Sequence, residues 1–139
     1  MMITCFGCEV SILTIIQSLI GFFIAAALVQ SGLDKITDRK GNMDWLMGHF
    51  SKTFLSSSVF IMLTVVTLLE LAGGLLCGIG ALMVLFGECS LWLMYGLTIS
   101  GVNFLMLFFG QRIAKDYEGA AVLVGYFILV ILGLLTFTI

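Results

Sequence analysis

The residue whose chemistry stands out first is Glu70, an acid inside a long apolar run of the 139-residue chain. Residues 59–86 are enough to cross a bilayer, and Glu70 lies roughly 17 Å from their start, near mid-membrane. An ionisable group at that depth costs about 2.5–3.5 kcal/mol on insertion scales and commonly marks a functional site. A protonated Glu70 could donate a hydrogen bond to a quinone carbonyl or relay a proton. Alternatively, it is a neutral acid that joins helices by bonding to Asn103 or Gln17.

Small residues accompany Glu70 and Asn103 at helical spacing, so each polar group should lie on a face that meets other helices. Asn103 lies within the apolar stretch 91–110, and Gln17 is the strongly polar residue of the first apolar stretch. The small residues are Gly73, Gly74, Cys77 and Ala81 with Glu70, and Gly96, Ser100 and Gly110 with Asn103.

Basic residues form a second candidate site. Lys35, Arg39 and Arg112 are expected at one membrane rim, where they could bind an anionic substrate, a lipid phosphate or a partner's acids. The alternative is that they only set the membrane topology. Gln30 and Gln111, at the ends of their spans, could line the mouth of a cavity leading towards Asn103 and Glu70.

His49 is the only histidine, four residues after Trp45. It is a candidate cofactor contact or an interfacial polar contact, because one histidine cannot build a bis-histidine haem site. We expect no metal site, since no cluster of ligand residues has zinc spacing. Cys5 and Cys8 form a CxxC, but the βαβ context of thioredoxin-like proteins is missing. Whether Cys5 and Cys8 act as a redox pair, or form a disulfide or a metal site together with Cys89, stays open.

The elements that must position these residues are transmembrane helices. The chain is 61% hydrophobic and only 10% charged, far from the composition of a soluble globule. It contains no proline. We predict an all-α fold, an integral membrane four-helix bundle in a single domain covering residues 1–139. The expected spans are residues 10–29, 59–86, 91–110 and 120–139.

The polar connection 30–53 should be structured and lie on the membrane. Gly32 is expected to end the first span as a helix cap, and Asn42 to cap a short interfacial helix. All six Lys and Arg residues lie in the first and third connections. The positive-inside rule places these connections in the cytoplasm and both termini outside.

Three stretches together resemble the DoxX family of small bacterial membrane proteins, particularly its Bacteroidota-type members. They are QSGLDKITDRKGNMDWLMGHFSKT (30–53), ELAGGLLCGIGA (70–81) and GQRIAKDYEGAA (110–121). The resemblance covers nearly the whole chain and implies a four-helix bundle in the bacterial inner membrane. Some relatives are subunits of membrane oxidoreductases, including a thiosulfate:quinone oxidoreductase. Some carry paired cysteines after the third span, which QRIAKDYEG lacks.

We therefore predict a small subunit or accessory of a quinone-linked membrane oxidoreductase complex, with quinone or bound lipid as ligand. Alternatives are a small-solute or proton carrier, and a structural subunit that docks a partner through residues 30–53. Expected partners are membrane lipids, redox subunits or further copies of the chain, and not nucleic acid. GxGxxG and a Ser-His-Asp arrangement are missing, so an autonomous enzyme is not expected. The candidate ligand-binding residues are Glu70, Asn103, Gln17, Trp45 and His49.

Overall fold

The fold is all-α apart from a short N-terminal hairpin. The computed structural model describes the backbone of residues 2–5 and 8–139, and side chains from Val10 onwards. Within these described residues, four helical segments are long and apolar enough to cross a membrane, namely α1, η1 with α3, α4, and α5. The predicted four-helix membrane bundle is confirmed, and the chain is a multi-pass membrane protein. The described elements are β1 (Met2–Cys5), β2 (Cys8–Ser11), α1 (Ile12–Thr37), α2 (Arg39–His49), η1 (Phe54–Ser58), α3 (Val59–Leu85), α4 (Leu91–Ile113) and α5 (Tyr117–Leu135).

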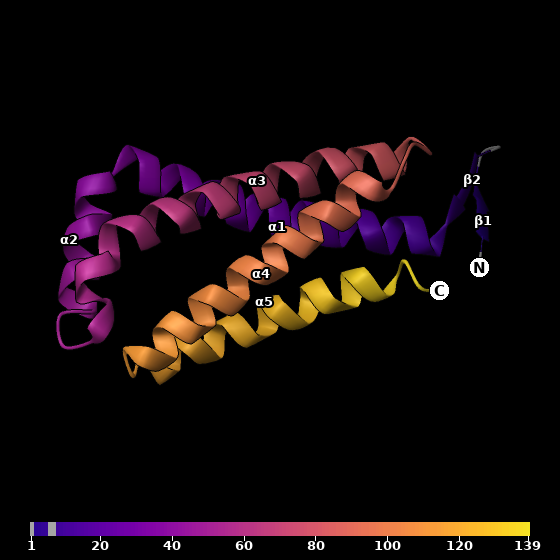
Figure 1. Cartoon of the computed structure of the whole chain (residues 1–139). Coiled ribbons are helices and arrows are strands. Elements are labelled where there is room, and N and C mark those ends of the chain that lie inside the picture. Colours follow the sequence, from indigo (N-terminus) through magenta and orange to yellow (C-terminus); the bar gives the residue numbers. More distant parts are fainter. Residues whose placement is uncertain (1, 6–7) are drawn as a thin grey trace.

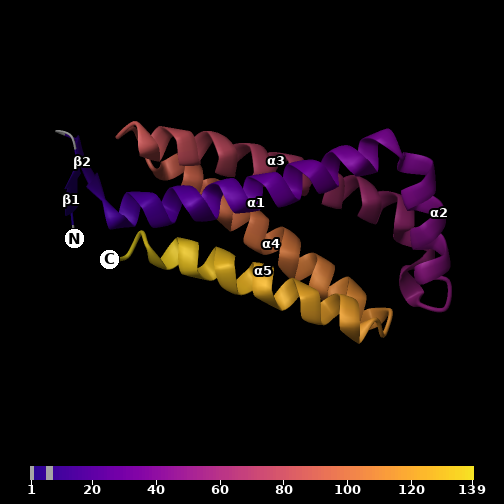
Figure 2. The same ribbon diagram turned by 180° about the vertical axis from the view of Figure 1, so that it is seen from behind.

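The long helices pack largely in series. α1 packs along α3, α3 along α4 and α4 along α5, while α1 and α5 touch over a smaller area. Figures 1 and 2 show α2 and the α4–α5 connection at one end of the bundle. The N-terminal hairpin, the α3–α4 turn and the C-terminus lie at the other end. The buried core is Ile20, Ile24, Leu28, Cys77, Val84, Leu93, Leu97, Phe104 and Val130.

Small residues let α3 and α4 approach closely. A Cβ added at Gly96 would lie 2.6 Å from the backbone nitrogen of Cys77, and one at Gly73 would lie 2.8 Å from Ser100 Oγ. The predicted small faces are indeed buried on both helices. In both views α4 lies against α3 near the α3–α4 turn and diverges from it towards α2 (Figures 1 and 2).

The first span extends further than predicted. α1 continues through Gly32 to Thr37, so the expected end of the span at residue 29 and the cap at Gly32 are wrong. The reason is packing: a Cβ at Gly32 would lie 2.7 Å from the side chain of Leu71. This glycine therefore permits close contact between α1 and α3 and does not end the helix.

Aspartates, and not Asn42, cap the helices next to the polar connections. Asp38 caps α2 by accepting a hydrogen bond from Gly41 N at 3.2 Å, and Asn42 lies inside that helix. Asp116 caps α5 by accepting from Gly119 N at 3.0 Å, so this helix begins at Tyr117 and not at residue 120. Both follow the general preference for Asp at helix N-termini.

Candidate functional site

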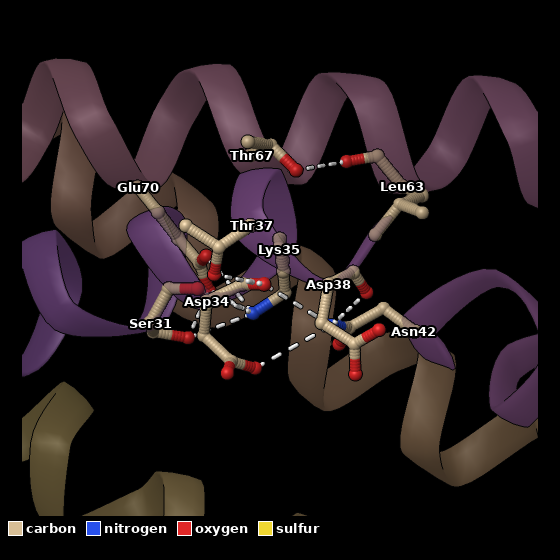
Figure 3. A network of polar contacts seen from close by, with 9 residues as sticks. All are labelled: Ser31, Asp34, Lys35, Thr37, Asp38, Asn42, Leu63, Thr67 and Glu70. Carbon is tan, nitrogen blue, oxygen red and sulfur yellow. Dashed lines mark hydrogen bonds and ion pairs between the residues drawn. The ribbon is translucent and has the colours of Figure 1, made fainter. Parts of the chain in front are cut away.

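Glu70 forms an ion pair with Lys35 inside the bundle. Lys35 Nζ lies 3.0 Å from Glu70 Oε2 and donates a hydrogen bond to Oε1 at 3.2 Å. Ser31 Oγ also donates to Oε1, at 3.2 Å, and accepts from Lys35 Nζ at 2.7 Å. The Glu70 side chain is 3% exposed and that of Lys35 17%. Figure 3 shows the three side chains meeting between α1 and α3.

The continuation of α1 creates this cluster. Ser31 and Lys35 are four residues apart, so they share one face of the extra helical turns and both reach Glu70 on α3. Because the ammonium and carboxylate charges compensate each other, the cluster carries no net charge. Ser31 was not among the candidate residues. Ser31 could have been predicted from its four-residue spacing to Lys35, if the first helix had been predicted to continue past Gly32.

The partners expected for Glu70 were wrong. Gln17 Nε2 donates to Thr136 Oγ1 at 3.0 Å and so joins the start of α1 to the end of α5. This places Gln17 at the opposite end of the bundle from α2. Glu70 makes its contacts with Lys35 and Ser31, not with Asn103. The predicted polar group of Glu70, Asn103 and Gln17 is therefore not a single cluster.

Asn103 is completely buried on α4, with 0% of its surface exposed. Among the described residues, neither its Nδ2 nor its Oδ1 has a hydrogen-bond partner. Most buried polar atoms in proteins are paired, so an unpaired buried amide calls for an explanation. Glu70 Oε2 is likewise buried and accepts no hydrogen bond of good geometry, although Lys35 lies beside it.

A cavity of about 370 Å³ lies at the α2 end of the bundle, where α3 and α4 diverge. Its volume falls within the range of small-molecule sites in proteins. The walls are mostly apolar, and the polar groups among them are Lys35, Asn42 and Gln111. The full lining is Lys35, Asn42, Trp45, Leu46, Phe50, Leu55, Met62, Leu63, Val66, Met106, Leu107, Phe109, Gly110 and Gln111. Of the two glutamines expected at a cavity mouth, only Gln111 lines this cavity. Gln30 is exposed beside a shallow depression on α1.

Helix α2 covers this cavity without being buried itself, since none of its residues is buried. Its attachment to the bundle is polar and aromatic. His49 Nε2 lies 2.7 Å from Gln111 Oε1 and 3.8 Å from Asp116 Oδ2. The ring of His49 stacks on Trp45 with centroids 4.4 Å apart, as their four-residue spacing predicts. Phe50, which ends the helix, is 4% exposed and packs near Gly110.

The three basic residues have separate partners and do not form one site. Lys35 pairs with Glu70. Arg39 donates to Thr64 Oγ1 at 2.6 Å and lies 5.1 Å from the Phe60 ring centroid. Arg112 lies 4.5 Å from the ring centroid of Tyr117 on α5. Both arginines therefore fasten the polar connections to neighbouring helices through cation–π contacts.

The side chains of Cys5 and Cys8 lie outside the described residues. Their backbones face each other in the β1–β2 hairpin. Cys89 is exposed in the α3–α4 turn. From Val10 onwards, no group of three His, Cys, Asp or Glu side chains is arranged to hold a metal ion.

Comparison of the chain with protein-family models, curated proteins and solved structures gives no match. The resemblance to the DoxX family therefore stays a prediction. The geometry adds an ion pair at the wall of an apolar cavity and, on α4, a buried amide that has no partner in the described part of the chain.

Proposed function

We propose that the protein binds an isoprenoid quinone in the cavity beneath α2, as a small integral subunit of a quinone-linked oxidoreductase in a bacterial inner membrane. The observation that carries this proposal is the cavity itself, because it combines apolar walls with very few polar groups. That combination suits a ligand with an apolar tail and a compact polar head.

The aromatic residues of the cavity support a ring-shaped head group. Trp45, Phe50 and Phe109 all contribute to the walls. Flat aromatic faces pack against a quinone ring by offset stacking or edge contacts. The Lys35 ammonium in the same wall can donate to a carbonyl oxygen in place of its long hydrogen bond, 3.5 Å, to Ser31 O.

The lipid-facing side of the cavity supports a long apolar tail. Met106 is 41% exposed and Phe109 is 64% exposed, and both line the cavity on α4. In a membrane, these exposed parts of an apolar helix face acyl chains. A tail leaving the cavity past them would stay in an apolar environment and lose no solvation.

Tryptophan fluorescence tests this proposal, because quinones quench it at short range. The chain has two tryptophans. Trp45 lines the cavity, while Trp92 lies in the first turn of α4 at the opposite end. In lipid nanodiscs, a Trp92→Phe variant reports on the cavity, and a Trp45→Phe variant is its matched control.

We expect a short-chain quinone to quench Trp45 saturably and Trp92 only in linear proportion to its concentration in the lipid. Equal, non-saturating quenching of both tryptophans would refute quinone binding in the cavity. Mass spectrometry of lipids extracted from the purified protein then identifies the natural quinone, and native mass spectrometry identifies co-purifying redox subunits.

The buried Lys35–Glu70 pair favours a second candidate, a proton carrier. Ionisable residues within membrane helices commonly belong to proton pathways. Proteoliposomes containing a pH-sensitive dye test this candidate. Proton flux above that of empty vesicles, lost in a Glu70→Gln variant, would favour the carrier over the quinone-binding subunit.

A further inference from the structure

The helix register places Asn103 level with Glu70 on the facing helix. α3 and α4 run antiparallel, and Gly96 meets Cys77 while Gly73 meets Ser100. Glu70 lies three residues before Gly73 on α3, and Asn103 lies three residues after Ser100 on α4. The same register therefore pairs Glu70 with Asn103. Both residues therefore lie at one depth of the bundle, and within the described part of the chain both have buried polar atoms without a hydrogen bond.

This depth lies just beyond the cavity, since neither Glu70 nor Asn103 is among the residues that line it. On α4, Leu107 and Gly110 line the cavity, and Asn103 lies four and seven residues before them on the same helical face. On α3, Leu63 and Val66 line the cavity. Glu70 lies seven residues after Leu63 and four residues after Val66, on the same face of the helix. One helical turn separates the lining from the two polar residues, about 5.4 Å along each axis.

Lys35 connects the two places, because it both lines the cavity and pairs with Glu70. Since the two charges compensate, the region just beyond the lining offers hydrogen-bonding groups without net charge. A neutral head group suits such a site. An anionic head group would have to displace the Glu70 carboxylate from Lys35 and leave that carboxylate buried without a counter-ion.

We propose that Asn103 is a ligand-binding residue, whose amide forms a hydrogen bond with an oxygen of a neutral ligand head group that enters the cavity head-first and reaches one helical turn past the present lining. Lys35 is the neighbouring donor, and the ligand tail leaves past Met106 and Phe109. The proposal rests on the proposed quinone-binding function and adds the orientation and charge of the ligand. It accounts for a buried amide that has no hydrogen-bond partner among the side chains and backbone groups that the structure describes.

An Asn103→Leu variant tests this role, since leucine is similar in size and has no polar atoms. The matched control is Ser100→Ala, because Ser100 is buried one turn away and its hydroxyl bonds Gly96 O within α4. Each variant is made with Trp92→Phe in nanodiscs. The two measurements are saturable Trp45 quenching by a short-chain quinone, and the unfolding midpoint without quinone.

We expect Asn103→Leu to bind the quinone at least tenfold more weakly and to unfold no earlier than the parent, because it removes an unpaired buried amide. Ser100→Ala should bind as the parent does. Unchanged binding by Asn103→Leu would overturn the inference. Weaker binding together with a lower midpoint would also overturn it, by showing that Asn103 holds the helices together. Absence of saturable quenching in the parent itself would instead refute the proposed function.

A competition experiment tests the expected charge of the head group. Decanoate and a neutral decyl-substituted quinone carry alkyl tails that differ by a single carbon, but they have different head groups. We expect the neutral quinone to displace the bound probe, and decanoate to fail at the same lipid mole fraction. Equal displacement by decanoate would show that the site accepts anions and would overturn the assignment of a neutral head group.

Discussion

Replacing Lys35 by Met should destabilise the bundle more than replacing Glu70 by Gln. Lys35→Met leaves a carboxylate whose side chain is 3% exposed with only the Ser31 hydroxyl as donor. Breaking a buried ion pair in this way costs about 3–5 kcal/mol. Because Ser31 remains, we expect the lower end of this range, about 3 kcal/mol, which is roughly a hundredfold change in the unfolding equilibrium.

Glu70→Gln should be the milder of the two substitutions, because the lysine that it leaves unpaired is partly exposed. The Lys35 side chain is 17% exposed, so in Glu70→Gln the ammonium can turn towards water at the α2 end of the bundle. We expect a cost of about 1–2 kcal/mol. The double variant Lys35→Met/Glu70→Gln contains neither charge and should lie within about 1 kcal/mol of the parent.

Cys77 offers a direct assay, because its side chain is 0% exposed between α3 and α4. With the other three cysteines changed to alanine, a thiol reagent reports unfolding during a titration with a denaturing detergent. Lys40→Met replaces an exposed lysine and is the control, with an expected change of less than about 0.5 kcal/mol. A double variant as unstable as Lys35→Met would refute the view that the uncompensated charge causes the loss.

Three further predictions concern packing, the attachment of α2 and topology. Gly96→Ala should destabilise the bundle by about 1–3 kcal/mol, because its Cβ would lie 2.6 Å from Cys77 N. Gly125→Ala places its Cβ in open space and should leave the midpoint of the same detergent titration unchanged. Equal midpoints for the two variants would contradict the prediction that Gly96 is needed for close packing. His49→Ala removes the contact with Gln111, worth about 1 kcal/mol, and should speed Lys-C cleavage after Lys52 about fivefold. A rate equal to that of the parent would show that His49 does not hold α2. Alkaline phosphatase fused at Asn42 should be inactive if this connection is cytoplasmic, and an active fusion would reverse the proposed orientation.

The buried faces of the helices could be predicted because small and polar residues recur at helical spacing. Glu70 is buried together with Gly73, Gly74 and Cys77, and Asn103 together with Ser100. In a membrane helix, small side chains mark the places where neighbouring backbones approach. The number of spans could be predicted because apolar stretches long enough to cross a bilayer alternate with short polar connections along the chain.

The partner of Glu70 could not be predicted, because the end of α1 was misplaced. A glycine followed by charged residues usually ends a membrane helix, and this interpretation assigned Lys35 to a polar connection. In the structure, Gly32 packs against Leu71 on α3, and α1 continues past this glycine to Thr37. Sequence spacing also cannot reveal the cavity, which depends on the angle at which α4 leaves α3. Phe50 was not a candidate site residue, because its burial beside Gly110 depends on how α2 packs against α4.

The position of the cavity lining along the chain has a consequence for biosynthesis. All of its residues lie between Lys35 and Gln111, whereas α5 begins at Tyr117 and packs mainly on α4. Proteins are made from the N-terminus, and early segments associate first. The walls of the cavity are thus synthesised in full before the last helix leaves the ribosome. A chain cut short after α4 would still encode every wall residue, and would lack the helix that packs on α4 and contributes Val130 to the core.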